Sequence, residues 1–236
     1  VEFETLVNTG LFTVRRAPAP TRVQALVGAV ENDGVLSFGP GVLAEVRTNG
    51  APFDNGGDLR LDQSTVAVLL DGGTFTLRPE GLIDISLASE LSIEDGLFRD
   101  LGGTIDDRGG FSIVGSDIFV PLGTTRLAEG VDLTLEDARF LGGGVYDFRS
   151  GTIVNTGTLT VETSTTLALN GGVLDQTGPI DNFGVIRLND GTLRARGGVT
   201  AGAWQLGPGG TLRVESDDIE LRDGASLAGA GAVQLL

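Results

Sequence analysis

The chain has 236 residues, with 16 basic and 32 acidic side chains and a formal net charge of −16. This charge excludes nucleic-acid binding that works by neutralising phosphates, and no apolar run approaches the roughly 18 residues of a membrane-spanning helix. His and Cys are absent and every basic residue is Arg, which excludes thiol and imidazole nucleophiles, Cys/His zinc sites and Schiff-base lysines.

A short motif recurs along the chain: Asn or a related residue, Gly, and then an apolar, a polar and an apolar residue. It occurs, in chain order, at residues 8–14, 32–38, 55–61, 79–85, 107–113, 129–135, 155–161, 182–188 and 208–214. A polar residue between two apolar ones indicates a short strand with one buried face. The first apolar residue of the pair moves from Phe12 to Leu212 over eight intervals, so the mean spacing is 25 residues.

The apolar pairs of these strands are expected to point inward and to stack as ladders in a shared core. They are Phe12/Val14, Leu36/Phe38, Leu59/Leu61, Ile83/Ile85, Phe111/Ile113, Leu133/Leu135, Leu159/Val161, Ile186/Leu188 and Leu212/Val214.

Gly makes up 38 residues, and Gly pairs between the strands suit sharp corners because Gly reaches positive φ at little cost. Three strands and three corners fit into about 25 residues at about 3.3 Å per strand residue. We therefore expect an all-β fold, a parallel β-helix of about nine coils that forms a single domain over residues 1–236. An antiparallel sandwich also has short strands and frequent turns, but it does not explain a unit that recurs nine times.

Three segments carry a resemblance to a known group of proteins: NTGTLTVETSTTLALNGGVLDQTG at residues 155–178, NFGVIRLNDGTLRA at 182–195 and SLAGAGAVQ at 226–234. They resemble the degenerate repeats of bacterial autotransporter passenger domains and filamentous-haemagglutinin-type exoproteins. The resemblance implies a right-handed β-helix that is exported to the cell surface as a segment of a longer chain, and it supplies no catalytic signature.

Outward carboxylates could form the acid and nucleophile pair of a glycosidase, which requires two carboxyl groups about 5 to 10 Å apart. The adjacent acids available for this are Glu94/Asp95, Asp106/Asp107, Glu136/Asp137 and Asp217/Asp218. In so acidic a chain we expect them to be solvated loop residues. We expect no cofactor, although residues 54–58 and 188–191 offer oxygen ligands that calcium could use.

Arg187 and Arg213 are predicted to occupy the same outward position in successive coils, where their guanidinium groups could bind a sulfated or carboxylated sugar. Trp204 and Tyr146, the only Trp and Tyr, could stack on a sugar ring, but Trp204 directly precedes an apolar position, which favours a place in the core.

The sequence thus predicts a non-enzymatic, secreted or surface-exposed β-solenoid, the shaft or fibre segment of a bacterial adhesin-like protein. Expected partners are a surface glycan or protein receptor, or further copies bound through the end coils, with no nucleic acid and no direct membrane insertion. A self-assembling filament subunit and a carbohydrate-active hydrolase or lyase remain alternatives.

Overall fold

The computed structural model describes residues 2–15, 22–101, 103–119, 124–126, 133–136, 138–149, 151–215 and 219–236. The regular secondary structure of these residues is β-strand. They include no helix that is long and apolar enough to cross a membrane. The chain divides into two compact units, Val1–Ser116 (unit 1) and Asp117–Leu236 (unit 2). The single domain expected over the whole chain stays a prediction.

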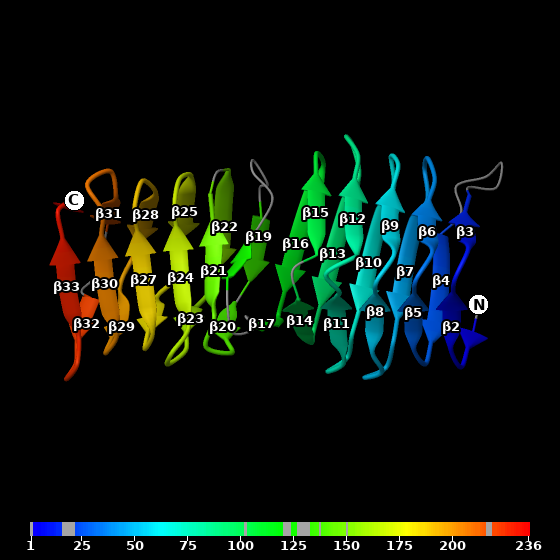
Figure 1. Ribbon diagram of the computed structural model, residues 1–236, viewed down its shortest axis with the longest axis horizontal. Helices are drawn as coiled ribbons and strands as arrows, with labels where there is room; N and C mark the ends of the chain where they lie inside the picture. The colour runs from blue at the N-terminus through cyan, green and yellow to red at the C-terminus, as the bar shows by residue number, and fades with distance from the viewer. Residues whose placement is uncertain are drawn as a thin grey trace. The chain divides into compact units, whose positions relative to one another are not determined.

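Unit 1 contains three parallel sheets, named here 1A, 1B and 1C (Figure 1). Sheet 1A consists of β1 (Glu2–Phe3), β4 (Arg22–Val27), β7 (Leu43–Arg47), β10 (Thr65–Leu69), β13 (Glu90–Glu94) and β16 (Gly110–Val114). Sheet 1B consists of β2 (Leu6–Asn8), β5 (Val30–Asn32), β8 (Phe53–Asn55), β11 (Thr74–Leu77) and β14 (Leu97–Asp100). Sheet 1C consists of β3 (Leu11–Val14), β6 (Val35–Phe38), β9 (Asp58–Leu61), β12 (Leu82–Ile85) and β15 (Thr104–Asp107).

Unit 2 also has three parallel sheets, named 2A, 2B and 2C. Sheet 2A consists of β19 (Leu133–Glu136), β22 (Thr152–Thr156), β25 (Val173–Gln176), β28 (Thr192–Ala195), β31 (Thr211–Val214) and β34 (Ala232–Leu235). Sheet 2B consists of β17 (Asp117–Phe119), β20 (Arg139–Leu141), β23 (Leu159–Val161), β26 (Ile180–Asn182), β29 (Gly198–Thr200) and β32 (Ile219–Leu221). Sheet 2C consists of β18 (Thr124–Arg126), β21 (Val145–Phe148), β24 (Thr166–Leu169), β27 (Val185–Leu188), β30 (Ala203–Leu206) and β33 (Ser226–Gly229).

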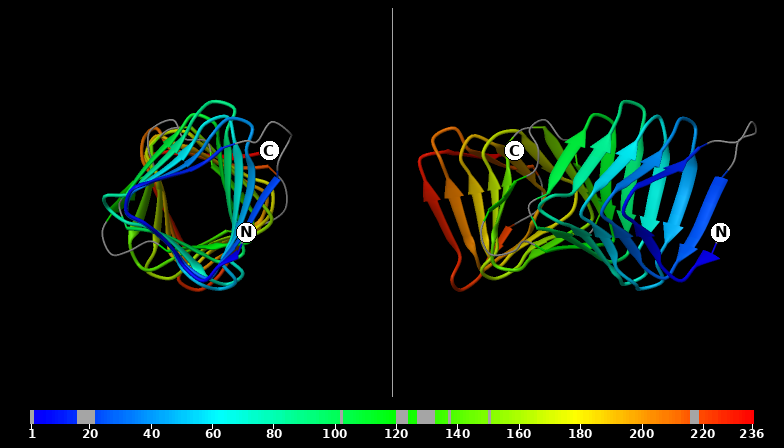
Figure 2. Two further views of the ribbon diagram at one scale, coloured as in Figure 1. Left: turned by 90° about the vertical axis from the view of Figure 1, so that its right-hand side faces the viewer. Right: turned by 45° about the vertical axis from the view of Figure 1, so that its right-hand side comes forward.

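Paired strands are parallel and lie three places apart in the chain, as β6 and β9 or β24 and β27 do. Within each unit the chain therefore winds as a three-sided coil whose successive turns hydrogen-bond to one another (Figure 2). This arrangement is a parallel β-solenoid, and it confirms the predicted fold class.

The turns are shorter than the predicted repeat of 25 residues. The described residues form about 10 turns with a spacing near 21 residues. Asn8 bonds to Asn32, 24 residues along, in unit 1, whereas Thr200 bonds to Asn182, 18 residues away, in unit 2. The predicted spacing of 25 residues is therefore too long for unit 2, whereas about 10 turns is close to the predicted nine coils.

The reason is that the motif occurs at more than one corner of a turn. In sheet 1C the predicted pairs do stack, with Leu36 beside Leu59 and Leu59 beside Ile83. Ile83 next pairs with Ile105, however, and the predicted successor Phe111 lies on β16 of sheet 1A. Later motifs likewise fall on different sheets, so the nine pairs do not form one ladder.

Most of the predicted inward residues are nevertheless buried. Buried are Leu36, Phe38, Leu59, Leu61, Ile83, Ile85, Phe111, Ile113, Leu133, Leu135, Leu159, Val161, Ile186, Leu188 and Leu212. Phe12 is 37% exposed, and Val14 and Val214 are half-buried. These three line open cavities in the first turns of unit 1 and the last turns of unit 2, where fewer neighbouring turns cover the core.

Aromatic rings stack through the core of unit 1. The ring centroids of Phe53 and Phe75 are 4.7 Å apart, those of Phe75 and Phe98 are 5.8 Å apart, and Phe98 meets Phe111 edge-on at 5.9 Å. Such pairs contribute about 0.5 to 1.5 kcal/mol each beyond the burial of their area.

Buried amides form a second ladder at the ends of β2, β5 and β8. Asn8 Nδ2 donates to Asn32 Oδ1 and Asn32 Nδ2 donates to Asn55 Oδ1, each at 2.7 Å. Asn32 Nδ2 also donates to the carbonyl of Asp58 at 3.0 Å. The ladder satisfies polar groups that would otherwise be buried without partners, and it ties the corner between sheets 1B and 1C from turn to turn.

Candidate functional site

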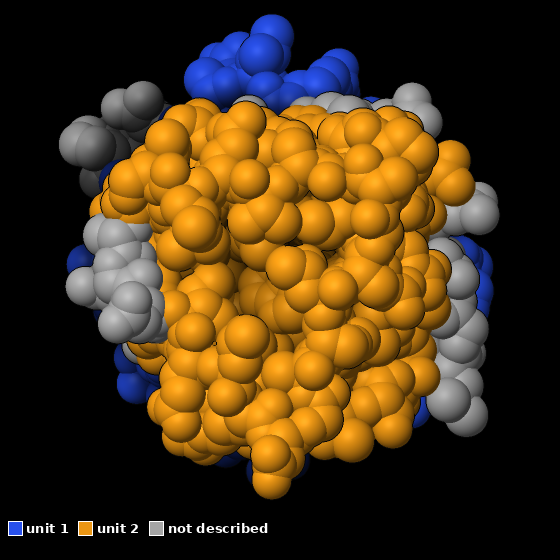
Figure 3. Space-filling view, turned by 90° about the vertical axis from the view of Figure 1, so that its left-hand side faces the viewer, with its two compact units in different colours: residues 1–116 blue, residues 117–236 orange. Residues whose placement is uncertain are grey.

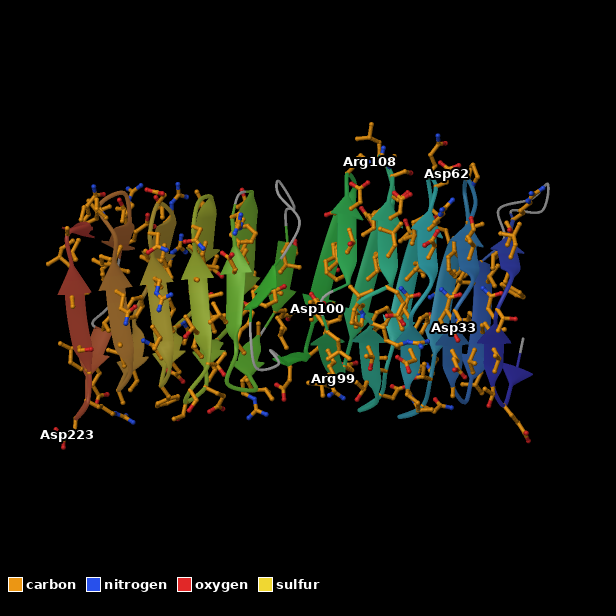
Figure 4. The ribbon with its side chains drawn as sticks, viewed as in Figure 1. Asp33, Asp62, Arg99, Asp100, Arg108 and Asp223 are labelled. Atoms are coloured by element: carbon orange, nitrogen blue, oxygen red, sulfur yellow. The ribbon has the colours of Figure 1, made fainter. Side chains whose placement is uncertain are left out.

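The carboxylates of sheet 1C do not form an isolated acid and nucleophile pair. Asp106 is the register partner of Asp84 on the neighbouring strand. Arg108 places Nη2 3.1 Å from Asp84 Oδ1 and Nε 3.9 Å from Asp106 Oδ1, and its side chain extends outward beyond the ribbon (Figure 4). Asp107 accepts a hydrogen bond from the amide of Gly109 at 2.9 Å. Asp84 and Asp106 therefore form ion pairs with Arg108, and Asp107 stabilises a turn.

The other adjacent acids lie at strand ends or corners, or outside the described residues. Glu94 accepts a hydrogen bond from Ser92 Oγ at 2.6 Å, and Asp95 holds a left-handed φ of 57° at the corner that follows β13. Glu136 is exposed at the end of β19. Asp137, Asp217 and Asp218 lie outside the described residues.

Each of the two segments considered for calcium has polar groups engaged in other contacts. In residues 54–58, Asp58 pairs with Arg60 at 2.5 Å and Asn55 belongs to the buried amide ladder. In residues 188–191, Asn189 donates to the side-chain oxygen of Asn170. Within the described part of the chain, no group of three or more carboxylates gathers as a metal site. The expectation of no cofactor, and calcium as the alternative to it, both stay predictions.

Arg187 and Arg213 do not lie in the same row, which corrects the prediction. Arg187 lies on β27 in sheet 2C, where its Nε donates to Gln205 Oε1 at 2.9 Å. Arg213 lies on β31 in sheet 2A, and its register partner is Arg194. The error follows from the assumed 25-residue spacing, because it aligned two motifs that occupy different sides of the coil.

The structure instead places three arginines together on the outer side of sheet 2A. We call Arg194, Arg196, Arg213 and Glu215 the arginine face. Arg194 and Arg213 are direct partners on adjacent strands, and Arg196 and Glu215 follow two residues after each of them. The sequence carried a signal for this pairing that was missed: the tripeptide Thr-Leu-Arg begins both β28 and β31.

Trp204 and Tyr146 are buried and not available for stacking on a sugar. Trp204 Nε1 donates to Thr200 Oγ1 at 2.9 Å, and Tyr146 packs against Phe140 with ring centroids 5.2 Å apart. The predicted core position of Trp204 is thus confirmed.

Trp204 also borders a cavity of about 640 Å³ in the last turns of unit 2, visible as a hollow in Figure 3. Its walls are mainly apolar and include Leu212, Leu227 and Leu235, of which Leu227 is 54% and Leu235 78% exposed. Apolar side chains of the kind that fill the solenoid core are therefore exposed to solvent in this cavity.

Ion pairs link successive turns on the outside of both units. Arg78 hydrogen-bonds Asp33, which Figure 4 labels, and lies 3.5 Å from Asp54. Partial burial lowers the pKa of Arg78, but its carboxylate neighbours, first Asp54 and then Asp33, outweigh that effect and raise it above its ordinary value. The Arg78 guanidinium therefore keeps its positive charge at neutral pH.

Arg139 makes the corresponding contact in unit 2. Its Nη2 donates to Asp117 Oδ2 at 2.7 Å, and Nη1 lies 3.5 Å from Glu162 Oε1. The hydrogen bonds to Asp117 raise the pKa of Arg139 above its ordinary value. Exposed pairs of this kind contribute at most about 1 kcal/mol each, so they align turns more than they stabilise them.

Comparisons with known proteins add no family. No protein-family model matches the chain, and searches of curated proteins and of solved structures return no match. The class that the strand pairing defines is the parallel β-solenoid, and what this solenoid does must be argued from its own residues.

Proposed function

We propose that the chain is a non-enzymatic structural segment, the shaft or a fibre segment of a secreted or cell-surface bacterial adhesin-like protein. The observation that carries the proposal is the stacking of parallel strands, turn upon turn, in the described residues of each unit. In unit 1, phenylalanine rings and buried amides also repeat from one turn to the next. Such stacking gives an element that resists bending and that can be lengthened by adding turns.

Two further features support a structural role. The chain has no His, Cys or Lys, so imidazole, the commonest general base, and thiol and amine nucleophiles are absent. Among the described catalytic candidates, Asp106 lies near Arg108, Glu94 accepts a hydrogen bond from Ser92 Oγ, and Asp107 accepts one from the amide of Gly109. The resemblance of the repeats to those of exported β-helix proteins favours the cell surface.

Two measurements on the purified chain test this proposal. Amide hydrogen exchange should show strong protection across the strands of each unit, because shaft stiffness requires the ladders to remain closed. Incubation with a panel of polysaccharides should release no reducing ends. Turnover that Asp84→Asn or Asp106→Asn abolishes would replace the structural proposal with a glycoside-cleaving enzyme, and weak protection throughout would contradict a stiff shaft.

The open cavity of unit 2 favours a second candidate, a subunit that self-associates through its end coils. The cavity wall exposes Leu221, Leu227 and Leu235, and among the described strands β32, β33 and β34 each have a partner on one side only. The first turn of a second copy could pair its strand edges with β32, β33 and β34 and cover the apolar cavity with its own apolar interior.

Sedimentation and electron microscopy over a range of protein concentrations test the second candidate. Filaments or a rising mass are expected, and Leu227→Asp should abolish them because it places a charge in the contact. The matched control is Leu87→Asp, which changes an exposed Leu in unit 1 outside both cavities. A constant monomer mass at the highest concentration would overturn self-association.

A further inference from the structure

The arginine face is an exception on the surface of a strongly acidic protein. The whole chain has 32 acids and 16 bases, yet Arg194 on β28, Arg213 on β31 and Arg196 just after β28 all lie within 4.0 Å of Glu215. Arg194 and Arg213 oppose each other across the strand pair, where neighbouring backbones lie about 4.8 Å apart. Like charges directly opposite each other are unfavourable unless something compensates them.

The compensation from the described residues is incomplete. All three arginines lie near Glu215, whose oxygens are 3.9 Å from Arg213 Nη2 and 4.0 Å from both Arg194 Nε and Arg196 Nη2. These separations are too long for hydrogen bonds. Asp175 adds one hydrogen bond, accepted from Arg194 Nη1 at 3.3 Å.

The donors of the face outnumber its acceptors. Each guanidinium has five N–H donors and no acceptor. The Nε atoms of Arg194 and Arg213 are shielded from solvent and have no hydrogen-bond acceptor. Asp175 Oδ1 is also shielded and has no hydrogen-bond donor. Three positive and two negative charges leave the described part of the face with a net positive charge, which suits an anion with several oxygens.

Two threonines lie beside the arginine face. Thr192 and Thr211 are register partners and lie two residues before Arg194 and Arg213 on the same outer side of sheet 2A. Both are half-buried, as are the two arginines. A ligand lying along the strands would therefore meet a row of hydroxyls beside a row of guanidinium groups.

We infer that the arginine face binds the sulfate or carboxylate group of an acidic carbohydrate. Paired guanidinium forks match the planar or tetrahedral oxygens of these groups, and the threonine hydroxyls suit the neighbouring sugar hydroxyls. The oxyanion chemistry follows from the arginines themselves, whereas the choice of a carbohydrate as its carrier rests on the proposed cell-surface role. The strongly negative remainder of the chain restricts binding to a short anionic segment.

Calorimetric titration of the full chain tests the inference with three probes: a sulfated heparin disaccharide, a digalacturonate and inorganic sulfate. The double variant Arg194→Gln/Arg213→Gln should weaken binding of a saccharide at least about tenfold, since it removes charge-assisted hydrogen bonds. The matched control Arg187→Gln, on sheet 2C of the same unit, should leave binding unchanged. Circular dichroism of each variant checks that the fold is intact.

A variant with the opposite effect separates binding from folding. Glu215→Gln removes the carboxylate that competes for all three arginines, so binding should tighten several-fold, most strongly at low salt. Equal losses for Arg187→Gln and the double variant, or weaker binding of Glu215→Gln, would overturn the site.

The three probes also separate this inference from the proposed function. Binding of inorganic sulfate alone would overturn the carbohydrate assignment. Binding of no probe by the folded chain would overturn the site and leave the hydrogen-exchange test of the shaft unaffected.

Discussion

The glycine of the recurring motif is required by the distance between successive turns. A Cβ atom on Gly57 would lie 2.1 Å from the carbonyl oxygen of Gly34, and one on Gly34 would lie 2.1 Å from that of Gly10. Their φ angles lie outside the left-handed region, so backbone freedom does not explain them. Close approach of two backbones does.

Gly57→Ala should therefore destabilise the protein by several kcal/mol, because the backbones of two neighbouring turns must move apart to make room for one methyl group. Gly10→Ala is the matched control, since a Cβ there meets nothing within 4 Å. Chemical denaturation of both variants measures the difference in the free energy of unfolding. Equal effects would contradict the packing explanation.

The buried amide ladder makes a similar prediction for Asn32, which both donates and accepts within it. Asn32→Ala leaves Asn8 Nδ2 and Asn55 Oδ1 without their partners in a buried corner, at a cost of about 2 to 4 kcal/mol. Thr13→Ala, on the half-buried outer side of β3, should cost well under 1 kcal/mol. Thermal and denaturant unfolding provide the comparison, and a mild Asn32→Ala would show that the ladder contributes little.

At the scale of the strand, alternation decides which side chains reach the core. Leu159 is buried and Thr160 is half-buried on β23. Leu159→Asp should unfold or strongly destabilise unit 2, because it buries an unpaired carboxylate, whereas Thr160→Asp should be mild. Unfolding transitions of the two variants test the assignment, and similar losses would show that the inward face was misassigned.

The same alternation explains how far sequence could predict the strands. It identified short strands and their inward residues, because a period of two depends only on local sequence. It could not fix which strands are neighbours, since Phe111 and Ile105 both fit as successors to Ile83 and only the length of the turn decides. The arginine face was missed for that reason: a spacing of 25 residues pairs Arg213 with Arg187, whereas the strands pair it with Arg194.

At the scale of the whole molecule, acidic residues exceed basic ones by two to one, for a net charge of −16. The ion pairs along the turns balance only part of this charge, so the folded state contains unscreened repulsion. Raising NaCl from low to physiological concentration should raise the unfolding temperature by a few degrees through screening. Scanning calorimetry over a salt series checks this, and a falling unfolding temperature would show that the local ion pairs dominate.

The stacking of turns also bears on how the chain acquires its structure. Each strand hydrogen-bonds to a strand only about one turn away, as with the 24 residues between Asn8 and Asn32 or the 19 between Asp175 and Arg194. No pairing inside a unit has to wait for a distant part of the chain, so the loop entropy paid at each step is the same however many turns precede it. A completed turn is the template on which the next turn pairs. Folding can therefore advance from one end while the rest of the chain is still being synthesised or exported.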